Sequence, residues 1–366
     1  MTDEKYMRLA LELAQKGCGR VNPNPMVGAV IVKDGRIIGQ GYHTRYKELH
    51  AEREALRACT ESPQGAEMYV TLEPCCHHGN QPPCTDAIIQ SGISRVIIGS
   101  ADPNPLVAGK GVELLKNHGI SVTEGFLKEE CDSINTVFFH FIRTGLPYVV
   151  MKYAMTMDGK IATYTGASKW ITGEAARARV HEDRNRYAAI MVGIGTVLKD
   201  APMLTCRIPG GRDPVRIICD TKLRIPVTSN IVTTAGDCRT IIATASEDRT
   251  LWEPLIKAGC EILSVPEKNG HIELAELARA IGKLKIDSIL LEGGATLNWS
   301  ALQAGIVNKV QAYMAPKLFG GTKAPSPIGG MGTDSPDRAV FLSSPVITVI
   351  GDDILVESEV RTCLQE

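Results

Sequence analysis

The sequence predicts an α/β protein with two domains, and three observations favour this fold class. Strand and helix patterns alternate along the chain, which is typical of sheets covered by helices. The chain has 366 residues, more than one compact core usually contains. A break at Gly145, Leu146 and Pro147 separates two runs that each hold enough elements for a core. We therefore expect domains at residues 1–145 and 146–366.

The elements of the first half follow in a regular order. Apolar residues at Met7, Ala10 and Leu13 form a helical stripe that ends near residue 17. Two β-rich runs flank Asp34 and Gly35, a dipeptide typical of a tight hairpin turn. We expect further helices over 50–59, 84–92 and 108–119, and strands over 66–75, 95–105 and 120–126.

The second half is predicted to be a second α/β layer structure. Its β-rich runs cover residues 148–155, 188–195, 215–220, 240–245, 287–294, 309–316 and 346–358. Helical segments lie between several of them, and the last strands predict an antiparallel end to the sheet. Residues 319–337 are rich in Gly, Pro and Ser and are expected to form a loop.

The composition excludes several classes of function. The net charge of −1 gives no bulk attraction to nucleic acid or to a membrane. No apolar run approaches the roughly 20 residues that span a bilayer. The eleven cysteines are odd in number, and the chain opens with a charged, amphipathic segment rather than a secretory signal. We therefore expect a cytoplasmic protein whose cysteines are mostly small buried residues.

One short region concentrates metal-binding residue types. His50 and Glu52 begin a predicted helix, Cys75 follows a strand, and Cys84 begins another helix. An imidazole and two thiolates are the ligands of an open zinc site whose fourth position holds water. Glu52 stands two residues from His50, so it is free to move the proton of that water. This pattern is typical of zinc nucleobase deaminases, although a lone His-x-Glu is usually only a polar helix start.

The choice of cysteines leaves alternatives. Cys75 and Cys84 are more widely spaced than in the usual motif, and Cys76, His77 and His78 are nearby candidates. We prefer Cys75 because it follows Pro74, and Cys84 because it begins a helix. If Cys76 or His78 closed the site as a fourth ligand, the zinc would be structural and Glu52 would have no role.

Longer motifs identify a family. In the first half they are VNPNPMVGAVIV, HAE, TLEPCCHHGNQPPC and ADPNPLVAGKG; in the second they are MKYAMTMDGKIAT, SKWITG, HEDRNRYAAIMVGIGTVLKDAPMLTCR and LLEGGATLNWSAL. With these motifs, in this order, nearly the whole chain resembles the bifunctional riboflavin-biosynthesis deaminase/reductase family. The resemblance implies a cytidine-deaminase-like three-layer domain, followed by a dihydrofolate-reductase-like domain with a mixed sheet.

The resemblance also implies two activities. The first half would hydrolytically deaminate 2,5-diamino-6-(5-phosphoribosylamino)pyrimidin-4(3H)-one with one zinc ion per chain. The second half would use NADPH to reduce the ribosyl group of 5-amino-6-(5-phosphoribosylamino)uracil to ribityl. Small-molecule substrates and a homo-oligomer, a dimer or a tetramer, are expected, with no nucleic acid and no membrane partner. The alternative is a tRNA or nucleotide deaminase fused to a nucleotide-binding domain, which the neutral charge disfavours.

The residues that the resemblance assigns fall into five groups. The zinc ligands are His50, Cys75 and Cys84, and the catalytic acid and base is Glu52. The deaminase substrate would be held by Asn24, His43 and Asn104. The NADPH contacts would be Ala154, Trp170, Thr196, Asp200, Gly294, Ala295, Thr296, Leu297, Asn298, Trp299 and Ser300. The reductase substrate contacts would be Lys152, Ser168, Arg184, Leu204, Arg207 and Glu292.

Several of these residues have ordinary structural interpretations as well. Asn beside Pro is common in turns, an isolated arginine is usually solvated, and the pair Gly293 and Gly294 also suits a tight strand-to-helix turn. Lys152 is expected to position or polarise the carbon that is reduced. Asn80 departs from the family, in which a cation is common at this place, so the substrate phosphate would rely on Lys110, His43 or backbone donors.

Overall fold

The computed structural model describes residues 3–79 and 81–361. Contacts within the chain divide it into two compact units that join between Gly145 and Leu146. Each unit has its own sheet and its own apolar core. No helix in the described part of the chain is long and apolar enough to cross a membrane.

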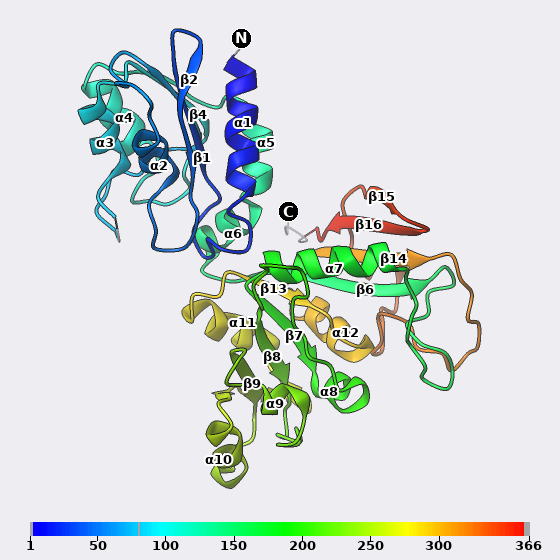
Figure 1. Ribbon diagram of the computed structural model, residues 1–366. Helices are drawn as coiled ribbons and strands as arrows, with labels where there is room; N and C mark the ends of the chain where they lie inside the picture. The colour runs from blue at the N-terminus through cyan, green and yellow to red at the C-terminus, as the bar shows by residue number, and fades with distance from the viewer. Residues whose placement is uncertain (1–2, 80, 362–366) are drawn as a thin grey trace. The chain divides into compact units, whose positions relative to one another are not determined.

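The first unit is built on a five-stranded sheet with the order β2-β1-β3-β4-β5 (Figure 1). Its strands are β1 (Gly28–Lys33), β2 (Arg36–Tyr42), β3 (Glu67–Leu72), β4 (Arg95–Ser100) and β5 (Ser121–Thr123). The first two form the predicted hairpin, in which Asp34 and Gly35 have φ angles of 50° and 74°. Two left-handed residues are what a type I′ turn requires. Strands β3, β4 and β5 are parallel, so their carboxyl ends meet at one edge.

Helices cover both faces of this sheet, which gives the expected three layers. One face carries α1 (Asp3–Gln15) and α5 (Lys128–Ile134), and the other carries α2 (Ala51–Arg57), α3 (Cys84–Ser91) and α4 (Lys110–Asn117). The last helix of this unit, α6 (Thr136–Thr144), adds Phe138 and Phe139 to the apolar core that lies between the sheet and α2, α3 and α4. The predicted stripe of α1 is buried, and a Cβ on Gly28 would lie 1.9 Å from the Ala10 carbonyl. Only glycine therefore allows α1 to pack this closely.

The second unit is built on a nine-stranded mixed sheet. Its order is β10-β9-β8-β7-β13-β6-β14-β16-β15. In this order, the strands from β10 through β14 run parallel to one another. Strand β16 pairs antiparallel with both β14 and β15, so the sheet has the antiparallel end that the sequence predicts. They are β6 (Tyr148–Thr156), β7 (Ala189–Gly193), β8 (Val215–Cys219), β9 (Thr240–Thr244), β10 (Glu261–Ser264), β13 (Ser288–Leu291), β14 (Val307–Ala315), β15 (Val346–Ile350) and β16 (Asp353–Glu359).

Most helices of this unit pack on one or other face of the sheet, because its central strands are apolar on both sides. Along β7, Ala189 and Met191 join one core while Ile190 and Val192 join the other. The first core contains α11 (Leu274–Lys283) and α12 (Ala295–Gln303); the second contains α8 (Ile194–Asp200), α9 (Asn230–Thr233) and α10 (Arg249–Lys257).

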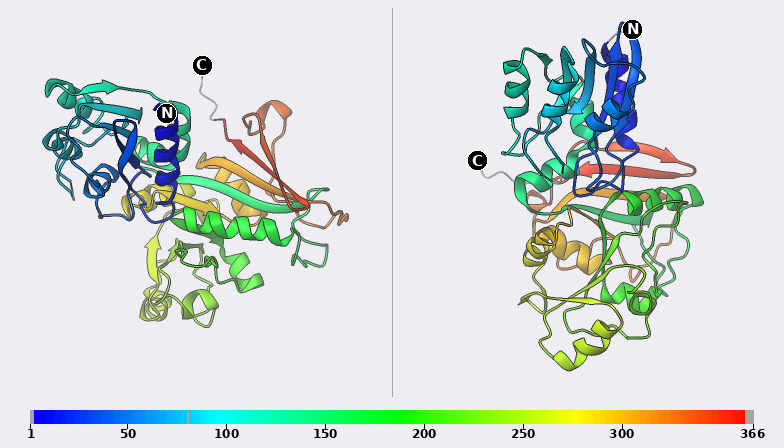
Figure 2. Two further views of the ribbon diagram at one scale, coloured as in Figure 1. Left: turned by 45° about the horizontal axis from the view of Figure 1, so that its top comes forward. Right: turned by 60° about the vertical axis from the view of Figure 1, so that its left-hand side comes forward.

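The remaining elements lie around these layers. Helix α7 (Glu174–Arg186) packs against β14 and β16, which with β15 form the twisted end of the sheet in Figure 2. A small hairpin, β11 (Glu267–Lys268) and β12 (His271–Ile272), precedes α11. Residues 319–337 form the expected loop, apart from a single 3₁₀ turn at Pro336–Arg338.

Two candidate active sites

The predicted zinc ligands converge at one edge of the first sheet. His50 is the N-cap of α2, Cys84 is the first residue of α3, and Cys75 follows β3. The Nδ1 atom of His50 lies 3.5 Å from the sulfur of Cys75 and 3.5 Å from that of Cys84. Hydrogen bonding from Cys84 lowers the pKa of Cys75, and His50 acts in the same direction. These donors, one nitrogen and two sulfurs, fit zinc.

The competing ligands do not join this group. Cys76 turns its sulfur to the carbonyl oxygen of Leu106, at 3.7 Å. His77 has a buried Nδ1 atom without a hydrogen-bond partner, but it is not part of the cluster. Within residues 3–79 and 81–361, only His50, Cys75 and Cys84 form a group of three or more such ligands. The arrangement is that of an open site rather than a closed, structural one.

Glu52 lies beside this cluster, in the first turn of α2. Its side chain is only 3% exposed and lines the same cavity as His50 and Cys75. Burial raises the pKa of this carboxyl, and the negative charge of Cys75 adds to the effect. A carboxyl whose proton is held more tightly than usual suits repeated proton transfer near neutral pH.

The cavity of the first unit has a volume of about 250 Å³ and is lined by the three predicted substrate contacts, Asn24, His43 and Asn104. The Nδ1 atom of His43 lies 3.0 Å from the carbonyl oxygen of Leu49. Because a carbonyl only accepts, Nδ1 carries the hydrogen, and Nε2 accepts from the Asn24 amide at 3.2 Å. Burial lowers the pKa of His43. His43 is therefore a neutral group in this structure and a poor phosphate-binding cation.

Asn104 lies in a turn and also faces the cavity. Its Oδ1 atom accepts the N–H of Leu106 at 3.1 Å, as in an Asx turn, which leaves its amide N–H groups for a ligand. Lys110 donates to the carbonyl oxygen of Pro105 at 2.8 Å and does not line the cavity. Asn80, the residue that departs from the family motif, lies outside the described residues.

Two acidic residues of this cavity were not predicted. Glu73, next to Pro74 and Cys75 in the sequence, is buried and accepts N–H groups from Asp102, Gly109, Gly111 and Val112. These bonds tie the loop that carries Asn104 to the end of β3. Burial raises the pKa of the second residue, Asp102, to about 6. The motif TLEPC marks the position of Glu73, but its partners follow only from the fold.

The second unit has a larger cavity, of about 630 Å³, at the carboxyl ends of β6, β13, β7 and β8. Most of the predicted contacts line it: Lys152, Ala154, Ser168, Thr196, Asp200, Glu292, Gly294, Ala295, Thr296, Leu297 and Ser300. Crevices at the carboxyl ends of parallel strands are where such sheets bind ligands. The location is therefore the one expected for a nucleotide cofactor.

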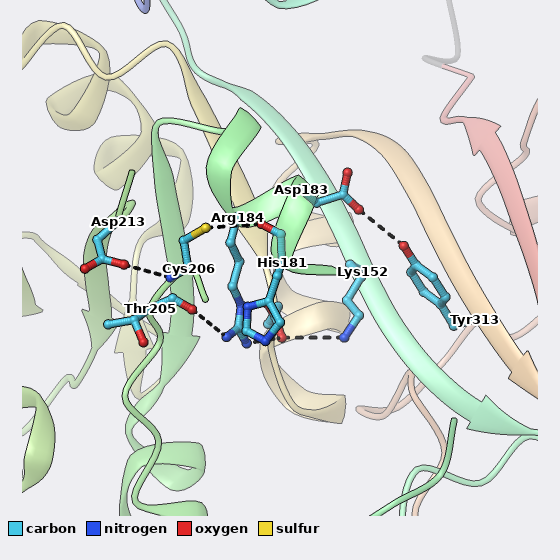
Figure 3. Close-up of polar contacts among 9 residues, drawn as sticks. Lys152, His181, Asp183, Arg184, Thr205, Cys206, Asp213 and Tyr313 are labelled. Carbon is cyan, nitrogen blue, oxygen red and sulfur yellow. Dashed lines mark hydrogen bonds and ion pairs between the residues drawn. The ribbon is translucent and has the colours of Figure 1, made fainter. Parts of the chain in front are cut away.

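A buried charge cluster lies at one end of this cavity. Arg184, from α7, holds Glu292 with Nε 2.8 Å from Oε1 and Nη2 3.1 Å from Oε2. Lys152, from β6, approaches Oε2 at 3.5 Å (Figure 3). Burial alone would raise the pKa of Glu292, but the charges of Arg184 and Lys152 outweigh it and lower this pKa to about 2. Glu292 is therefore ionised.

Lys152 is held from a second side. Its ammonium nitrogen lies 5.8 Å from the centre of the Tyr313 ring. The Tyr313 hydroxyl donates to Asp183 at 3.2 Å (Figure 3). A cation over an aromatic face is attracted by the ring, so Tyr313 and Glu292 together fix where the Lys152 ammonium lies.

A short glycine turn fits a dinucleotide phosphate. Gly294 is the N-cap of α12 and has no side chain that could accept a hydrogen bond from the first turn of the helix. The first N–H groups of α12 are therefore not capped by that residue and can point at an anion. A Cβ on Gly293 would lie 2.6 Å from Oδ1 of Asn298, so a larger residue would displace the turn. Both glycines line the cavity. This arrangement fits the phosphates of NADPH.

The other predicted contacts do not line the cavity. Asn298 is buried and donates from Nδ2 to the carbonyl oxygen of Pro327 at 3.0 Å. Trp299 packs against Gly330, where a Cβ would lie 2.0 Å from its ring. Trp170 is 61% exposed beneath the Arg177 guanidinium. Leu204 is buried in the core beside β7, and Arg207 is exposed. Conversely, Thr221, Arg224 and His271 line the cavity without having been predicted.

Comparisons with known proteins give matches for both parts of the chain. Residues 147–356 match the family model described as RibD C-terminal domain. Residues 1–100 match the model of the cytidine and deoxycytidylate deaminase zinc-binding region. The curated riboflavin biosynthesis protein RibD of Actinobacillus pleuropneumoniae is 54% identical over 98% of this chain and 95% of that protein. That of Bacillus amyloliquefaciens is 44% identical over 96% and 95%.

Solved structures share the architecture over the whole chain. A diaminohydroxyphosphoribosylaminopyrimidine deaminase/5-amino-6-(5-phosphoribosylamino)uracil reductase from Thermotoga maritima is 40% identical, with a TM-score of 0.87 over 98% of each chain. RibD of Acinetobacter baumannii is 35% identical, with a TM-score of 0.88 over 98% of this chain and 99% of that one. The expected fold class, a deaminase-like unit followed by a reductase-like unit with a mixed sheet, is confirmed.

Proposed function

The chain belongs to the RibD family of bifunctional riboflavin-biosynthesis enzymes, and we propose that each of its two cavities serves one of the two reactions. It is a zinc-dependent deaminase and an NADPH-dependent reductase. Residues 1–145 deaminate 2,5-diamino-6-(5-phosphoribosylamino)pyrimidin-4(3H)-one. Residues 146–366 reduce the ribosyl group of the deaminated product to ribityl. The observation that carries the proposal is the open cluster of His50, Cys75 and Cys84 with Glu52 buried beside it.

In the first cavity, the chain supplies ligands and a proton carrier. His50, Cys75 and Cys84 would hold the zinc ion, which would supply the activation of water as a nucleophile. Glu52 accepts a proton of the attacking water and gives it to the ring nitrogen. It then accepts the proton of the newly added hydroxyl and gives it to the amine, which departs as ammonia as the carbonyl forms. Its burial in the same cavity keeps bulk water from competing for that proton.

The polar groups of this cavity recognise the pyrimidine rather than its phosphate. His43 accepts the amide of Asn24 and so fixes the orientation of that side chain. The remaining amide N–H of Asn24 and those of Asn104 face the cavity as hydrogen-bond donors. Because neither residue is charged, they distinguish the base by hydrogen bonding. The substrate phosphate lies towards the mouth of the cavity, where Lys47 also contributes to the lining.

In the second cavity, the charge cluster holds the sugar end of the substrate and the glycine turn holds the cofactor. NADPH supplies the hydride. The ionised Glu292 accepts hydrogen bonds from substrate hydroxyls, and Lys152 donates a proton to the ring oxygen as the sugar opens. Gly294 and Ala295 at the start of α12 bind the cofactor phosphates. Ser168 and Arg207 lie further along the sugar phosphate.

Paired variants of the full chain test this assignment. Glu52→Gln should abolish ammonia release but leave reduction of the deaminated substrate unchanged. Gly294→Val should block reduction, because its side chain would occupy the phosphate site, and leave deamination unchanged. If either variant lost both activities while remaining folded, the two reactions would share a site and the proposed division would be wrong.

We also propose that the protein is a cytoplasmic homo-oligomer. Support for an oligomer comes from β15, an edge strand of the nine-stranded sheet whose Val346, Ile347 and Val349 are 63%, 63% and 73% exposed. Exposed apolar edge strands readily pair with a second copy. Light scattering should give a mass above that of one chain, and Val349→Lys should lower it. The ten described cysteines are all free, which suits a reducing compartment; fractionation of cells tests the location.

A further inference from the structure

A buried asparagine of the first unit holds the backbone of the loop that carries Asn24. Asn135 stands where α5 ends and α6 begins, 109 residues after Met26, and is 2% exposed. Its Oδ1 atom accepts the N–H of Met26 at 2.8 Å, and its Nδ2 atom donates to the carbonyl oxygen of Met26 at 2.9 Å. One side chain thus satisfies both backbone polar groups of Met26.

The place of Asn135 in the chain favours a different use of this side chain. Asparagine is among the preferred N-cap residues, because its side chain can accept an N–H from the first turn of a helix. Asn135 is the N-cap of α6, yet its side chain makes no cap hydrogen bond. Both polar ends of the side chain are directed at Met26 instead. A local preference that is given up in this way is typical of functional sites.

The loop before β1 needs support from outside because two of its residues are prolines. Pro23 and Pro25 have no N–H group, so neither can be held by donating a backbone hydrogen bond. The N–H of Asn24 donates to a carbonyl within the loop itself. The pair of bonds between Met26 and Asn135 therefore ties this stretch to a distant part of the unit.

The same loop forms part of the wall of the first cavity. Its residues that line the cavity are Asn24, Pro25 and Val27. Met26, whose backbone Asn135 holds, lies between two of them in the chain. Phe138, which follows Asn135 in the first turn of α6, lines the cavity as well. A shift of the Met26 backbone would therefore move groups that face the substrate.

We propose that Asn135 is a positioning residue of the deaminase, which aims the amide of Asn24 at the pyrimidine by fixing the backbone of Met26. The inference rests on the proposed role of Asn24 in binding the base. His43 supports the Asn24 side chain at 3.2 Å, and Asn135 supports its backbone two residues further along. Both supports matter, because a hydrogen bond weakens steeply when its distance or angle is wrong. Asn135 does not line the cavity, so it acts on the substrate through the loop.

Asn135→Asp is a change that pH can reverse. An ionised carboxylate would accept the N–H of Met26 but would repel its carbonyl oxygen. A protonated carboxyl restores the pattern, because one oxygen accepts and the other donates. Burial beside a carbonyl oxygen raises the pKa of a carboxyl, so lowering the pH favours the restored form.

Thr136→Ala is the matched control at the same helix junction. It removes an exposed hydrogen bond, from the Thr136 hydroxyl to the carbonyl oxygen of Ser133 at 3.2 Å. The experiment measures steady-state deamination by the zinc-loaded full chain. The variants are Asn24→Ala, Asn135→Ala, Asn135→Asp, Thr136→Ala and the double variant Asn24→Ala with Asn135→Ala.

Asn135→Ala should raise the KM of deamination by about tenfold, as for the loss of one good hydrogen bond to the base. The kcat should change by less than about twofold, because a bond made equally in the ground and transition states affects KM alone. In the Asn24→Ala background, Asn135→Ala should raise KM little further, since the group that it positions is already gone. Thr136→Ala should have the KM of wild type.

The pH arm decides the question even if Asn135→Ala fails to fold. Compared with wild type at each pH, Asn135→Asp should recover a lower KM as the pH falls from about 8 to about 6. A constant ratio over this range would overturn the inference. So would additive effects of Asn24→Ala and Asn135→Ala, because Asn135 would then not act through Asn24. A wild type that released no ammonia would instead overturn the proposed deaminase itself.

Discussion

Arg184 and Glu292 face each other as a bidentate pair, with contacts of 2.8 Å and 3.1 Å, and Glu292 lines the cavity of the second unit. The side chains are only 14% and 15% exposed, so neither charge is well solvated by water. Such a pair is costly to break, because removing one partner leaves the other buried without compensation. The carboxylate of Glu292, which we propose contacts the sugar of the substrate, thus owes its ionised state and its orientation to a residue on α7.

The first prediction concerns the removal of Arg184. Arg184→Ala should lower the free energy of unfolding of the second unit by about 3 kcal/mol, which is at the lower end of the range for breaking a buried ion pair. We choose the lower end because Lys152 still faces Glu292 and partly compensates its charge. Urea unfolding followed by tryptophan fluorescence measures this change, since Trp170, Trp252 and Trp299 all lie in the second unit. Arg179→Ala is the control on the same helix: its pair with Glu182 is half-exposed and worth less than about 1 kcal/mol. Equal effects of the two variants would contradict the prediction.

The second prediction concerns pH. The pKa of Glu292 in the folded chain is about 2, below its ordinary value of 4.5. A lowered pKa means that the stabilisation is present above the ordinary value and is lost as the pH falls towards 2. Between pH 5 and pH 3, wild type should therefore lose more unfolding free energy than Glu292→Gln, which cannot titrate at this position. Urea titrations at several pH values test this, and parallel curves for the two proteins would count against it.

The third prediction concerns Glu52. Glu52→Gln should lower the rate of deamination by about 10²- to 10⁴-fold, because an amide cannot carry a proton between water, ring nitrogen and amine. Zinc content, measured by mass spectrometry of the metal, should remain one ion per chain because Glu52 is not a ligand. Glu54→Gln is the control on the same helix. Glu54 pairs with Arg57 and does not line the cavity, so this variant should deaminate normally. A Glu52→Gln protein with near-normal ammonia release would remove Glu52 from the reaction.

The fourth prediction concerns Glu73, which we regard as a positioning residue. Glu73→Gln should raise the KM of deamination several-fold while kcat changes less, because the amide N–H groups would face N–H donors of the loop that carries Asn104. Zinc content should be unchanged. Glu61→Gln is the control, because Glu61 forms an exposed ion pair with Arg36, and this variant should have the KM of wild type. A fall in zinc content with unchanged KM would instead make Glu73 a support of the metal ligands.

The zinc site was predictable because its residues stand at element boundaries that short patterns mark. His50 and Cys84 stand at the starts of helices and Cys75 follows a strand, so a local pattern marks the place of each ligand. The alternation of strands and helices likewise predicted both sheets and the antiparallel end. The choice of Cys75 over Cys76 followed from its place after Pro74, and the structure turns Cys76 towards Leu106.

Other features depend on contacts between distant segments and gave no local signal. The neutral state of His43 follows from Leu49 and Asn24, on either side of it in the chain. Arg216 lies in the strand predicted over residues 215–220 and is fully buried and bonded to Thr234, Thr240 and Cys238. Asn298 stands in a predicted cofactor segment, yet its side chain binds Pro327. Periodicity describes one element at a time, so it could not predict these pairings.

The last prediction concerns Arg207, which the resemblance assigns to the reductase substrate. The side chain is exposed in this structure, so its loss leaves no buried charge, and the expected cost is that of one charged hydrogen bond. With the phosphorylated substrate, Arg207→Ala should therefore lower kcat/KM of reduction, and the loss of transition-state stabilisation should be about 1.5–3 kcal/mol. Arg207→Lys should recover part of the activity, because an ammonium lacks the planar fork.

The dephosphorylated substrate separates phosphate binding by Arg207 from a structural role. A phosphate held at the far end of the sugar fixes where the reacting carbon lies, so binding energy is used for positioning. Arg207→Ala should then hardly affect reduction of the dephosphorylated analogue, which never made the contact. Arg212→Ala offers a contrast, because Arg212 donates to the carbonyl oxygen of Tyr187 and its loss should affect both substrates alike. If Arg207→Ala also reduced both substrates equally, Arg207 would support the structure of its loop and would not bind the phosphate.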